Sequence, residues 1–380
     1  MNKQETLSIQ KITSFDPPKR RLMGPGPSDI HPRVLNALSR HTIGHLDPEF
    51  VRMMDEVKGL TQYVFQTKNE LSMVVSGPGS AGMETCFVNL VEPGDKVIVC
   101  QNGVFGGRMK ENVERCGGTA VMVMDDWGKP VDLDKVAAVL KANPDTKIIA
   151  FVHAETSTGV RSDAAGLCAL ARQHGCLTIV DAVTSLGGIP VLVDEWGIDA
   201  IYSGSQKCLS ATPGLSPISF SPKAVEAIKN RKTKVQSWFL DLSLVMKYWG
   251  GGVKRSYHHT APINALYCMH EALVMCQEEG LENRWNRHQE MHLRLKDGLE
   301  DLGFRFLVDA PYRLPQLNAV FLPEGLDEAV IRKQLLNEFN LEVGGGLGAF
   351  AGKIWRVGLM GHTARAESVD YCLEALRKIL

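Results

Sequence analysis

The sequence lacks any uninterrupted apolar run of about 18 residues, so no membrane-spanning helix is expected. It also lacks an excess of positive charge, since 42 basic and 43 acidic side chains give a net charge of -1 at pH 7. Without a basic surface, neither nucleic acid nor an anionic membrane is expected as a partner, which leaves small polar or anionic metabolites. The polar N-terminus has no signal-type stretch and Arg377–Leu380 is no Ser-Lys-Leu address, so we expect a cytoplasmic protein.

Motifs for metals, disulfides and nucleotides are missing as well. The nine cysteines include no Cys-x-x-Cys pair and lie mostly in apolar runs such as Val97–Cys100, which favours reduced core thiols in a reducing compartment. The adjacent His258 and His259 do not predict a metal site, because neighbouring side chains diverge in helices and in strands. No P-loop and no clean dinucleotide fingerprint occur, which argues against an NAD-dependent oxidoreductase.

The chain does contain a repeated alternation of short apolar segments and amphipathic segments. This βαβα rhythm, with continuous apolar strands, is typical of a mostly parallel sheet with helices on both faces. In such an α/β fold the polar loops at the strand ends converge on one crevice. The expected strands are 71–75, 96–100, 119–123, 147–152, 177–181, 200–202 and 217–221, and the expected helices include 133–140, 164–174 and 224–229.

Two polar residues follow or end these apolar strands. Lys207 lies on a loop after the strand 200–202, and Asp181 is the last residue of the strand 177–181. A lysine in apolar surroundings becomes less basic and can form a Schiff base, although a solvated surface lysine is the commoner reading when the residue is taken alone. A lysine of this kind, together with an aspartate that keeps a pyridine nitrogen protonated, is typical of a pyridoxal 5'-phosphate (PLP) site.

A glycine-rich loop, Ser76–Gly82, lies between the strand 71–75 and a predicted helix. A helix that begins directly after such a loop presents unpaired N–H groups and its positive end to an anion. Taken alone, the loop is equally well explained as a tight turn. Beside Lys207 and Asp181, it predicts a site for the PLP phosphate at Gly79 and Ser80.

The segments around Asp181 and Tyr202–Lys207, with Tyr257–Thr260 and the stretch Gly345–Leu359, resemble the class V (fold type I) aminotransferases. Within that class the chain most resembles the alanine–glyoxylate and serine–glyoxylate (serine–pyruvate) group. The resemblance implies a PLP-dependent enzyme that moves the amino group of alanine or serine to glyoxylate or a similar 2-oxo acid by a ping-pong mechanism. It also implies a homodimer with shared active sites.

The resemblance further implies a role for individual residues. Lys207 would carry PLP and act as the general base, and Asp181 would keep the pyridine nitrogen protonated. Arg356, a charge within an apolar strand, would receive the substrate carboxylate, where a structural ion pair is the other reading. The remaining residues implied are the cofactor-binding Gly79, Ser80, Phe105, Thr156, Val183 and Gln206, the substrate-binding Gly26, and Tyr257 and Thr260, which would reach the phosphate in the other subunit.

Three departures from the family pattern leave the donor and acceptor open: Pro78 and Thr156 stand where serines are expected, and Phe105 where a tryptophan is expected. Other class V activities remain alternatives. A ureidoglycine–glyoxylate enzyme is expected to have asparagine at position 257, and a pyridoxamine–pyruvate enzyme an acidic residue at 79 or 80. A cysteine desulfurase-like lyase needs a catalytic cysteine on a flexible loop, whereas Cys208 beside the lysine suggests packing.

The 380 residues, 44% of them hydrophobic, suffice for two domains. We expect an N-terminal arm (1–20), a large PLP-binding domain (21–262), and an interdomain helix with a smaller α+β C-terminal domain (263–380). In this last part the expected helices are 263–279, 280–302, 328–339 and 366–380, the expected strands are 318–322 and 354–357, and 344–350 is expected to be a mobile or tightly folded loop.

Overall fold

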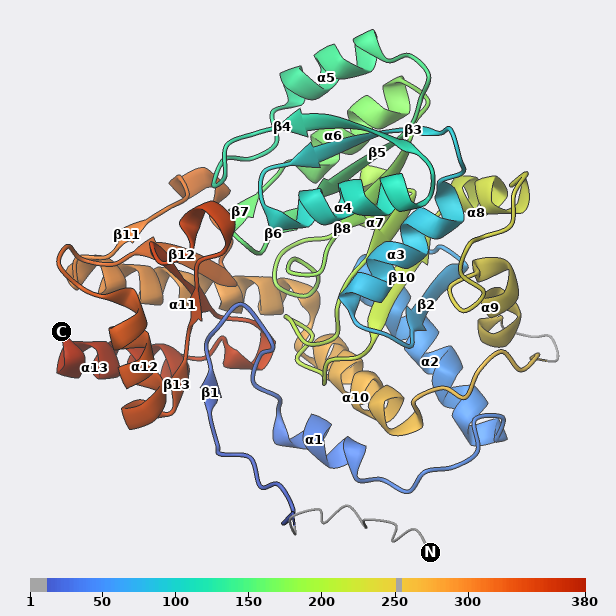
Figure 1. Ribbon diagram of the computed structural model, residues 1–380. Coiled ribbons are helices and arrows are strands. Elements are labelled where there is room, and N and C mark those ends of the chain that lie inside the picture. Colours follow the sequence, from blue (N-terminus) through green and yellow to red (C-terminus); the bar gives the residue numbers. More distant parts are fainter. Residues whose placement is uncertain (1–11, 251–254) are drawn as a thin grey trace, which may run out of the picture.

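The centre of the molecule is a seven-stranded sheet (Figure 1). The computed structural model describes residues 12–250 and 255–380. The strand order is β2-β10-β9-β8-β5-β3-β4, in which β10 is antiparallel to both of its neighbours and all other pairs are parallel. This confirms the mostly parallel sheet. The strands are β2 (Leu71–Val75), β3 (Lys96–Gln101), β4 (Thr119–Met124), β5 (Thr146–Val152), β8 (Leu177–Asp181), β9 (Ala200–Tyr202) and β10 (Ser216–Phe220).

Helices cover both faces of this sheet (Figure 1). The helix α4 (Val104–Arg115) connects β3 to β4, and α5 (Leu133–Ala142) connects β4 to β5 in the opposite direction across the sheet. Because parallel crossovers are right-handed, these two helices lie on opposite faces. The helix α3 (Gly79–Leu90) contacts α4, and α6 (Ala164–Gln173) contacts α5. The central strands are therefore buried on both sides, which explains their continuous apolar sequences.

A further group of helices packs at the β2 end of the sheet. Here α10 (Ile263–Glu279) contacts both α1 (Pro32–Leu38) and α2 (Pro48–Phe65). The helix α2 was not predicted from the sequence. Asp47 caps it by accepting a hydrogen bond from the N–H of Glu49. The remaining helices before residue 251 are α7 (Val193–Trp196), α8 (Pro222–Lys229) and α9 (Leu242–Trp249).

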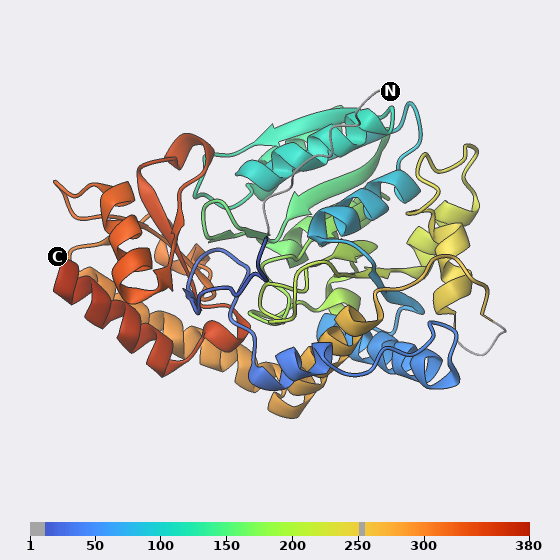
Figure 2. The same cartoon turned by 60° about the horizontal axis from the view of Figure 1, so that its bottom comes forward.

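The C-terminal part has a smaller core of its own around an antiparallel four-stranded sheet, which lies to the left in Figure 2. The predicted loop 344–350 is tightly folded, with a short strand that pairs with β15. The N-terminal β1 (Arg21–Leu22) pairs with β13 (Leu341–Glu342), which joins the N-terminal segment to the C-terminal part. The proposed domain boundaries stay a prediction. The other elements are β11 (Arg305–Phe306), β12 (Leu317–Phe321), β14 (Gly344–Gly345), β15 (Ile354–Gly358), α11 (Leu281–Asp301), α12 (Glu328–Phe339) and α13 (Ala366–Ile379).

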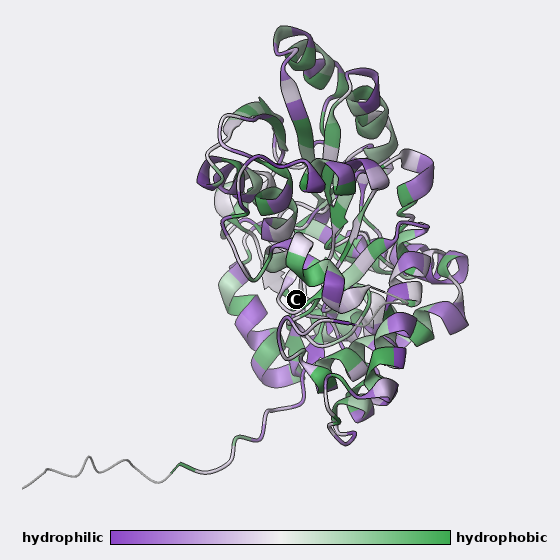
Figure 3. Cartoon of the chain, turned by 90° about the vertical axis from the view of Figure 1, so that its right-hand side faces the viewer, coloured by the Kyte–Doolittle hydropathy of each residue, from purple (hydrophilic) through white to green (hydrophobic). Residues whose placement is uncertain are grey.

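Most helices carry hydrophilic and hydrophobic residues on different sides (Figure 3). Within residues 12–250 and 255–380, no helix combines the length and the apolar character that a membrane crossing requires. All nine cysteines are buried and free, as expected for reduced core thiols.

Candidate active site

Three polar side chains lie where adjacent strands of the large sheet end. Asp181 is the last residue of β8, Tyr202 is the last residue of β9, and the two are paired in the register of these parallel strands. Lys207 follows on the loop after β9, as the sequence predicted. The carboxyl ends of parallel strands form the crevice of an α/β sheet, so these residues are placed where such folds bind ligands.

The Lys207 amine is enclosed by the N-terminal segment. Lys207 is 9% exposed, and its Nζ donates a hydrogen bond to the backbone carbonyl of Pro25. Burial lowers the pKa of Lys207 to about 8, and the positive charge of Arg356 acts in the same direction. Gly26 has a φ of +99°, and a Cβ at this position would lie 2.6 Å from Lys207 Nζ. Only glycine therefore allows this close approach. Burial makes the Lys207 amine a weaker base than an exposed lysine.

The Asp181 carboxylate is held by two hydrogen-bond donors. Its Oδ1 accepts from the Val183 N–H at 2.8 Å, and its Oδ2 accepts from the Tyr202 hydroxyl at 2.7 Å. Burial raises the pKa of Asp181 to about 6, although both hydrogen bonds and the nearby Lys207 charge act to lower it. The carboxylate is thus ionised at neutral pH, and a cationic ligand would relieve the penalty of its burial. Tyr202 was not among the predicted site residues, and the sequence showed only that it ends the predicted strand 200–202.

The glycine-rich loop has the geometry of an anion site. The helix α3 begins at Gly79, directly after the loop that follows β2, and its N-cap residue Pro78 provides no side-chain hydrogen bond. In the part of the chain that the structure describes, the N–H groups of Gly79 and Ser80 donate no hydrogen bond, and the buried Oε1 of Gln206 accepts none. A Cβ on Gly79 would lie 3.2 Å from Val183 Cγ2, so this helix end packs closely on the residue that braces Asp181. Open N–H groups at a helix N-terminus can bind a phosphate.

Arg356 extends from the small sheet to the loop that follows β5. Its Nε donates to the Gly345 carbonyl at 2.9 Å, and its Nη1 donates to the Thr156 carbonyl at 3.1 Å. Arg356 is 6% exposed, and no carboxylate among the described residues lies within 4.0 Å of its guanidinium. Burial lowers its pKa to about 10, which leaves it charged at neutral pH. Among the residues that the structure describes, the structural ion pair considered from sequence is thus not formed, and an anionic ligand would stabilise the buried charge.

The same loop also fixes the start of α4. The carboxyl group of Glu155, which is fully buried, accepts hydrogen bonds from the Phe105 N–H at 3.2 Å and from the Ser157 hydroxyl at 2.6 Å. Burial raises the pKa of Glu155 to about 7. The next residue, Thr156, places its hydroxyl 2.5 Å from that of Thr184. Glu155, which was not among the predicted site residues, thus positions Phe105, which was.

The predicted subunit-bridging residues are exposed in the single chain. Tyr257 is 62% exposed, and Thr260 is exposed as well. Between them, His259 contacts the Ser76 hydroxyl through Nε2 at 2.8 Å and His258 through Nδ1 at 2.8 Å. This segment is thereby linked to the beginning of the glycine-rich loop. Across the described ranges, no cluster of three or more His, Cys, Asp or Glu side chains is arranged to hold a metal ion.

Comparison with protein families decides which fold family this geometry represents. The model of the family "Aminotransferase class-V" matches residues 26–366. The chain belongs to the class V aminotransferases. The sequence of this aminotransferase aligns with those of other members over nearly its whole length.

The alanine–glyoxylate aminotransferase of Rattus norvegicus is 44% identical over 365 residues, which cover 96% of this chain and 88% of the relative. The crystal structure of an alanine–glyoxylate aminotransferase from Nostoc sp. superimposes with a TM-score of 0.95 at 46% identity, covering 98% of this chain and 100% of that one. The (S)-ureidoglycine–glyoxylate transaminase of Bacillus subtilis is 35% identical over an alignment of 382 positions, which covers 96% of this chain and 91% of the relative. The fold type I architecture and the aminotransferase class are confirmed.

Proposed function

We propose that this aminotransferase moves the amino group of alanine or serine to glyoxylate or a similar 2-oxo acid, using PLP attached to Lys207. One observation carries the proposal. A buried amine of lowered basicity shares its surroundings with the carboxylate of Asp181 and with Arg356, a buried cation that has no carboxylate partner in the described chain. The names of the similar proteins in Rattus and Nostoc support glyoxylate as the acceptor and alanine as the donor.

The residues present fit the functional groups of PLP. The open N–H groups of Gly79 and Ser80 and the unsatisfied Gln206 amide oxygen would hold the phosphate, with Tyr257 and Thr260 added from the partner subunit. Asp181 matches the pyridine nitrogen, because a cation there would offset the raised pKa of the carboxyl group. The groups assigned to the ring and its phenolic oxygen are Val183, Phe105 and Thr156.

When bound, PLP would act as an electron sink for the negative charge that develops when the substrate Cα–H bond breaks. Asp181 would support this by holding the proton on the pyridine nitrogen, with Val183 and Tyr202 fixing its orientation. The Lys207 amine would then take the Cα proton as a general base, a role that suits a pKa of about 8.

Arg356 would bind the substrate carboxylate. Its Nε and Nη1 are already directed by the Gly345 and Thr156 carbonyls, so the guanidinium plane is oriented before the substrate arrives. A guanidinium can bind a carboxylate through two parallel hydrogen bonds, which fixes the orientation of the substrate as well as its position. This preorganisation would present the Cα–H bond to Lys207.

The other class V activities are supported less well than the proposed transamination. In a ureidoglycine–glyoxylate enzyme we expect asparagine where this chain has Tyr257, and in a pyridoxamine–pyruvate enzyme an acidic residue at Gly79 or Ser80. A cysteine desulfurase-like lyase needs an accessible thiol, whereas all nine cysteines are buried and burial raises the pKa of Cys208 to about 12.

A homodimer and a cytoplasmic location belong to the same proposal. The exposure of Tyr257 and Thr260 is consistent with side chains that complete a site in a second subunit. Nine free cysteines are consistent with a reducing compartment.

A two-step spectroscopic experiment tests the proposal. The PLP-loaded protein is mixed with L-alanine, L-serine or L-cysteine, each alone, and the cofactor absorbance is followed. We expect alanine or serine to bleach it to the pyridoxamine form and glyoxylate to restore it. Sulfide release from cysteine without bleaching would identify a lyase instead. Borohydride reduction followed by peptide mapping should place the cofactor on Lys207, and labelling of another residue would refute that assignment.

A further inference from the structure

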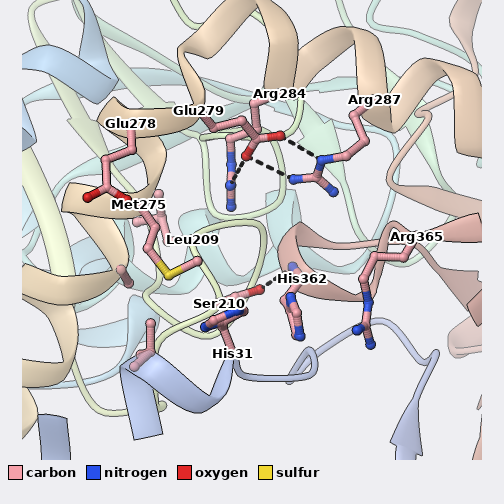
Figure 4. A pocket seen from close by; sticks show the side chains of 12 residues that line it. His31, Leu209, Ser210, Met275, Glu278, Glu279, Arg284, Arg287, His362 and Arg365 are labelled. Carbon is pink, nitrogen blue, oxygen red and sulfur yellow. Dashed lines mark hydrogen bonds and ion pairs between the residues drawn. The ribbon is translucent and has the colours of Figure 1, made fainter. Parts of the chain in front are cut away.

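A cavity of about 400 Å³ lies beneath the loop that follows Lys207 (Figure 4). Leu209 and Ser210 of this loop line it, together with residues of α1, α10, α11 and the turn before α13. None of the residues proposed above to hold cofactor or substrate lines it. Its volume is that of a site for a small organic molecule.

Part of the charge around this cavity is neutralised internally. The lining residue Glu278 pairs with Arg33 at 2.7 Å, and two arginines share one further carboxylate. Arg284 and Arg287 both bind the carboxylate of Glu279, at 2.7 Å and 2.6 Å (Figure 4). Arg365 is held much less firmly, since its nearest carboxylate oxygens, on Asp29 and Glu367, are 3.9 Å and 4.0 Å away. Its Nε is buried and has no hydrogen-bond partner among the described residues. Arg365 therefore contributes the positive charge that a ligand could neutralise.

Two imidazoles lie beside this guanidinium. The rings of His31 and His362 meet edge to face with their centroids 4.8 Å apart. Nδ1 of His31 accepts a hydrogen bond from the Arg33 N–H at 3.1 Å, so the neutral ring carries its proton on Nε2 and can donate from there. Burial and neighbouring cations lower the pKa of His362 to about 4, which keeps that ring neutral. An anion in the cavity could therefore accept hydrogen bonds from the charged Arg365 and from one or both neutral imidazoles.

The opposite wall is apolar and is formed by Val34, Leu209, Ala272 and Met275. An inorganic anion would leave this wall in contact with water. A molecule with a carboxylate at one end and a short aliphatic part at the other would cover it. We propose that the cavity binds such a small organic carboxylate, with its charge on Arg365 and its aliphatic part on this wall.

A ligand in this cavity would act on the backbone of Lys207 through a chain of hydrogen bonds. The Ser210 hydroxyl accepts a hydrogen bond from the backbone N–H of His362 at 2.8 Å and contacts the Ser28 hydroxyl at 3.0 Å. Ser28 in turn donates to the Lys207 carbonyl at 2.8 Å. Ser210 also has a φ of 54°, an uncommon conformation for a residue other than glycine. A short chain of contacts thus connects the cavity to the backbone of Lys207.

The test is calorimetric titration of the PLP-loaded protein with 2-methylpropanoate, which has neither an amino nor an oxo group and cannot react. Two sites per chain are expected, one at Arg356 and one in the cavity. Arg365→Gln should weaken the cavity site by about tenfold or more and leave basal turnover unchanged. Arg356→Gln should remove only the other site. The control Arg294→Gln, which removes an exposed pair with Asp370, should keep both.

The two proposals fail separately in this experiment. If Arg356→Gln abolishes all binding, the cavity proposal is overturned and the proposed substrate site stands. If Arg365→Gln abolishes all binding, the assignment of Arg356 fails instead. Equal affinity for inorganic phosphate and 2-methylpropanoate at the cavity would overturn the role of the apolar wall. Should Arg365→Gln not fold, His362→Gln replaces it, and unchanged binding in that variant would count against the site.

The contact with Lys207 has its own readout, which depends on the proposed function. Saturating 2-methylpropanoate should shift the visible circular dichroism of bound PLP in Arg356→Gln, where only the cavity site remains. The shift should be absent when Arg365→Gln is added. An unchanged spectrum at calorimetric saturation would show that the ligand binds without reaching the lysine.

Discussion

Replacing Arg356 with alanine gives the sharpest test of the proposed substrate site. The side chain is 6% exposed and its guanidinium has no carboxylate partner in the described chain, so a bound carboxylate would supply its neutralising charge. A hydrogen bond to a charged group contributes about 1.5–3 kcal/mol, so a bidentate pair contributes about 3–6 kcal/mol. At 1.4 kcal/mol per factor of ten, kcat/KM for L-alanine should fall by about 10²-fold to 10⁴-fold.

The assay is the single-turnover reaction of the PLP-loaded variant with L-alanine, followed by cofactor absorbance at several alanine concentrations. Arg356→Lys should fall between wild type and Arg356→Ala, because an ammonium keeps the charge but cannot form two parallel hydrogen bonds. The control substrate is ethylamine, which is alanine without its carboxylate and should react equally slowly with wild type and with both variants.

A structural role for Arg356 predicts a different pattern. Its hydrogen bonds to the Gly345 and Thr156 carbonyls also disappear in the variant, so a general distortion of the site would slow alanine and ethylamine alike. Equal losses for both amines, or an unchanged kcat/KM for alanine, would refute the assignment of this residue as the carboxylate receptor.

Four further predictions concern Lys207, Gly26 and Glu155. Lys207→Ala should bind PLP without covalent attachment and lose turnover by at least about 10³-fold in the single-turnover assay, since the general base is gone. In the PLP-free protein, the pKa of Lys207 is lowered from 10.5 to about 8, so burial of the charged amine destabilises the fold below pH 8 by ~3 kcal/mol and the penalty disappears as pH rises to 10.5. Urea unfolding should therefore show Lys207→Met to be more stable than wild type at pH 7 but not at pH 10.5. Gly26→Ala, which places a Cβ 2.6 Å from Lys207 Nζ, should weaken PLP binding in an equilibrium titration, whereas Gly325→Ala, also at positive φ but with nothing within 4 Å, should not. Glu155→Gln should raise the PLP dissociation constant by about tenfold, because its amide nitrogen would face one of two donors, the Phe105 N–H or the Ser157 hydroxyl.

Much of the site could be predicted because it lies at the ends of strands that the sequence marks clearly. Asp181 and Lys207 each follow a continuous apolar segment, and the glycine-rich loop separates a strand from a helix, as the structure confirms. These signals are local. Each depends only on the residues immediately before and after it, and a parallel sheet then brings the strand ends together.

The contacts that were missed join distant parts of the chain. The hydrogen bond from Tyr202 to Asp181 depends on the register of two neighbouring strands, and the one from Phe105 to Glu155 depends on two loops of the same sheet edge. A tyrosine or glutamate at such a position has no periodicity to mark it. The helix α2 was missed although it has a capping aspartate and a proline at its start, which were local signals in the sequence.

The basicity of Lys207 is the clearest case of a property that its own segment does not determine. Among its immediate neighbours only Cys208 acts on the pKa of Lys207 by charge, and it acts to raise that pKa. The shift arises from burial under the turn at Pro25 and from the charge of Arg356, which belong to the two ends of the chain. That turn is held by the pairing of β1 with β13 and by the hydrogen bond from the Gly358 N–H to the Met23 carbonyl at 2.7 Å. The N-terminal segment and the small sheet are therefore parts of the proposed active site. A substitution that loosens their junction should raise the pKa of Lys207 even though it touches no residue near the sheet edge.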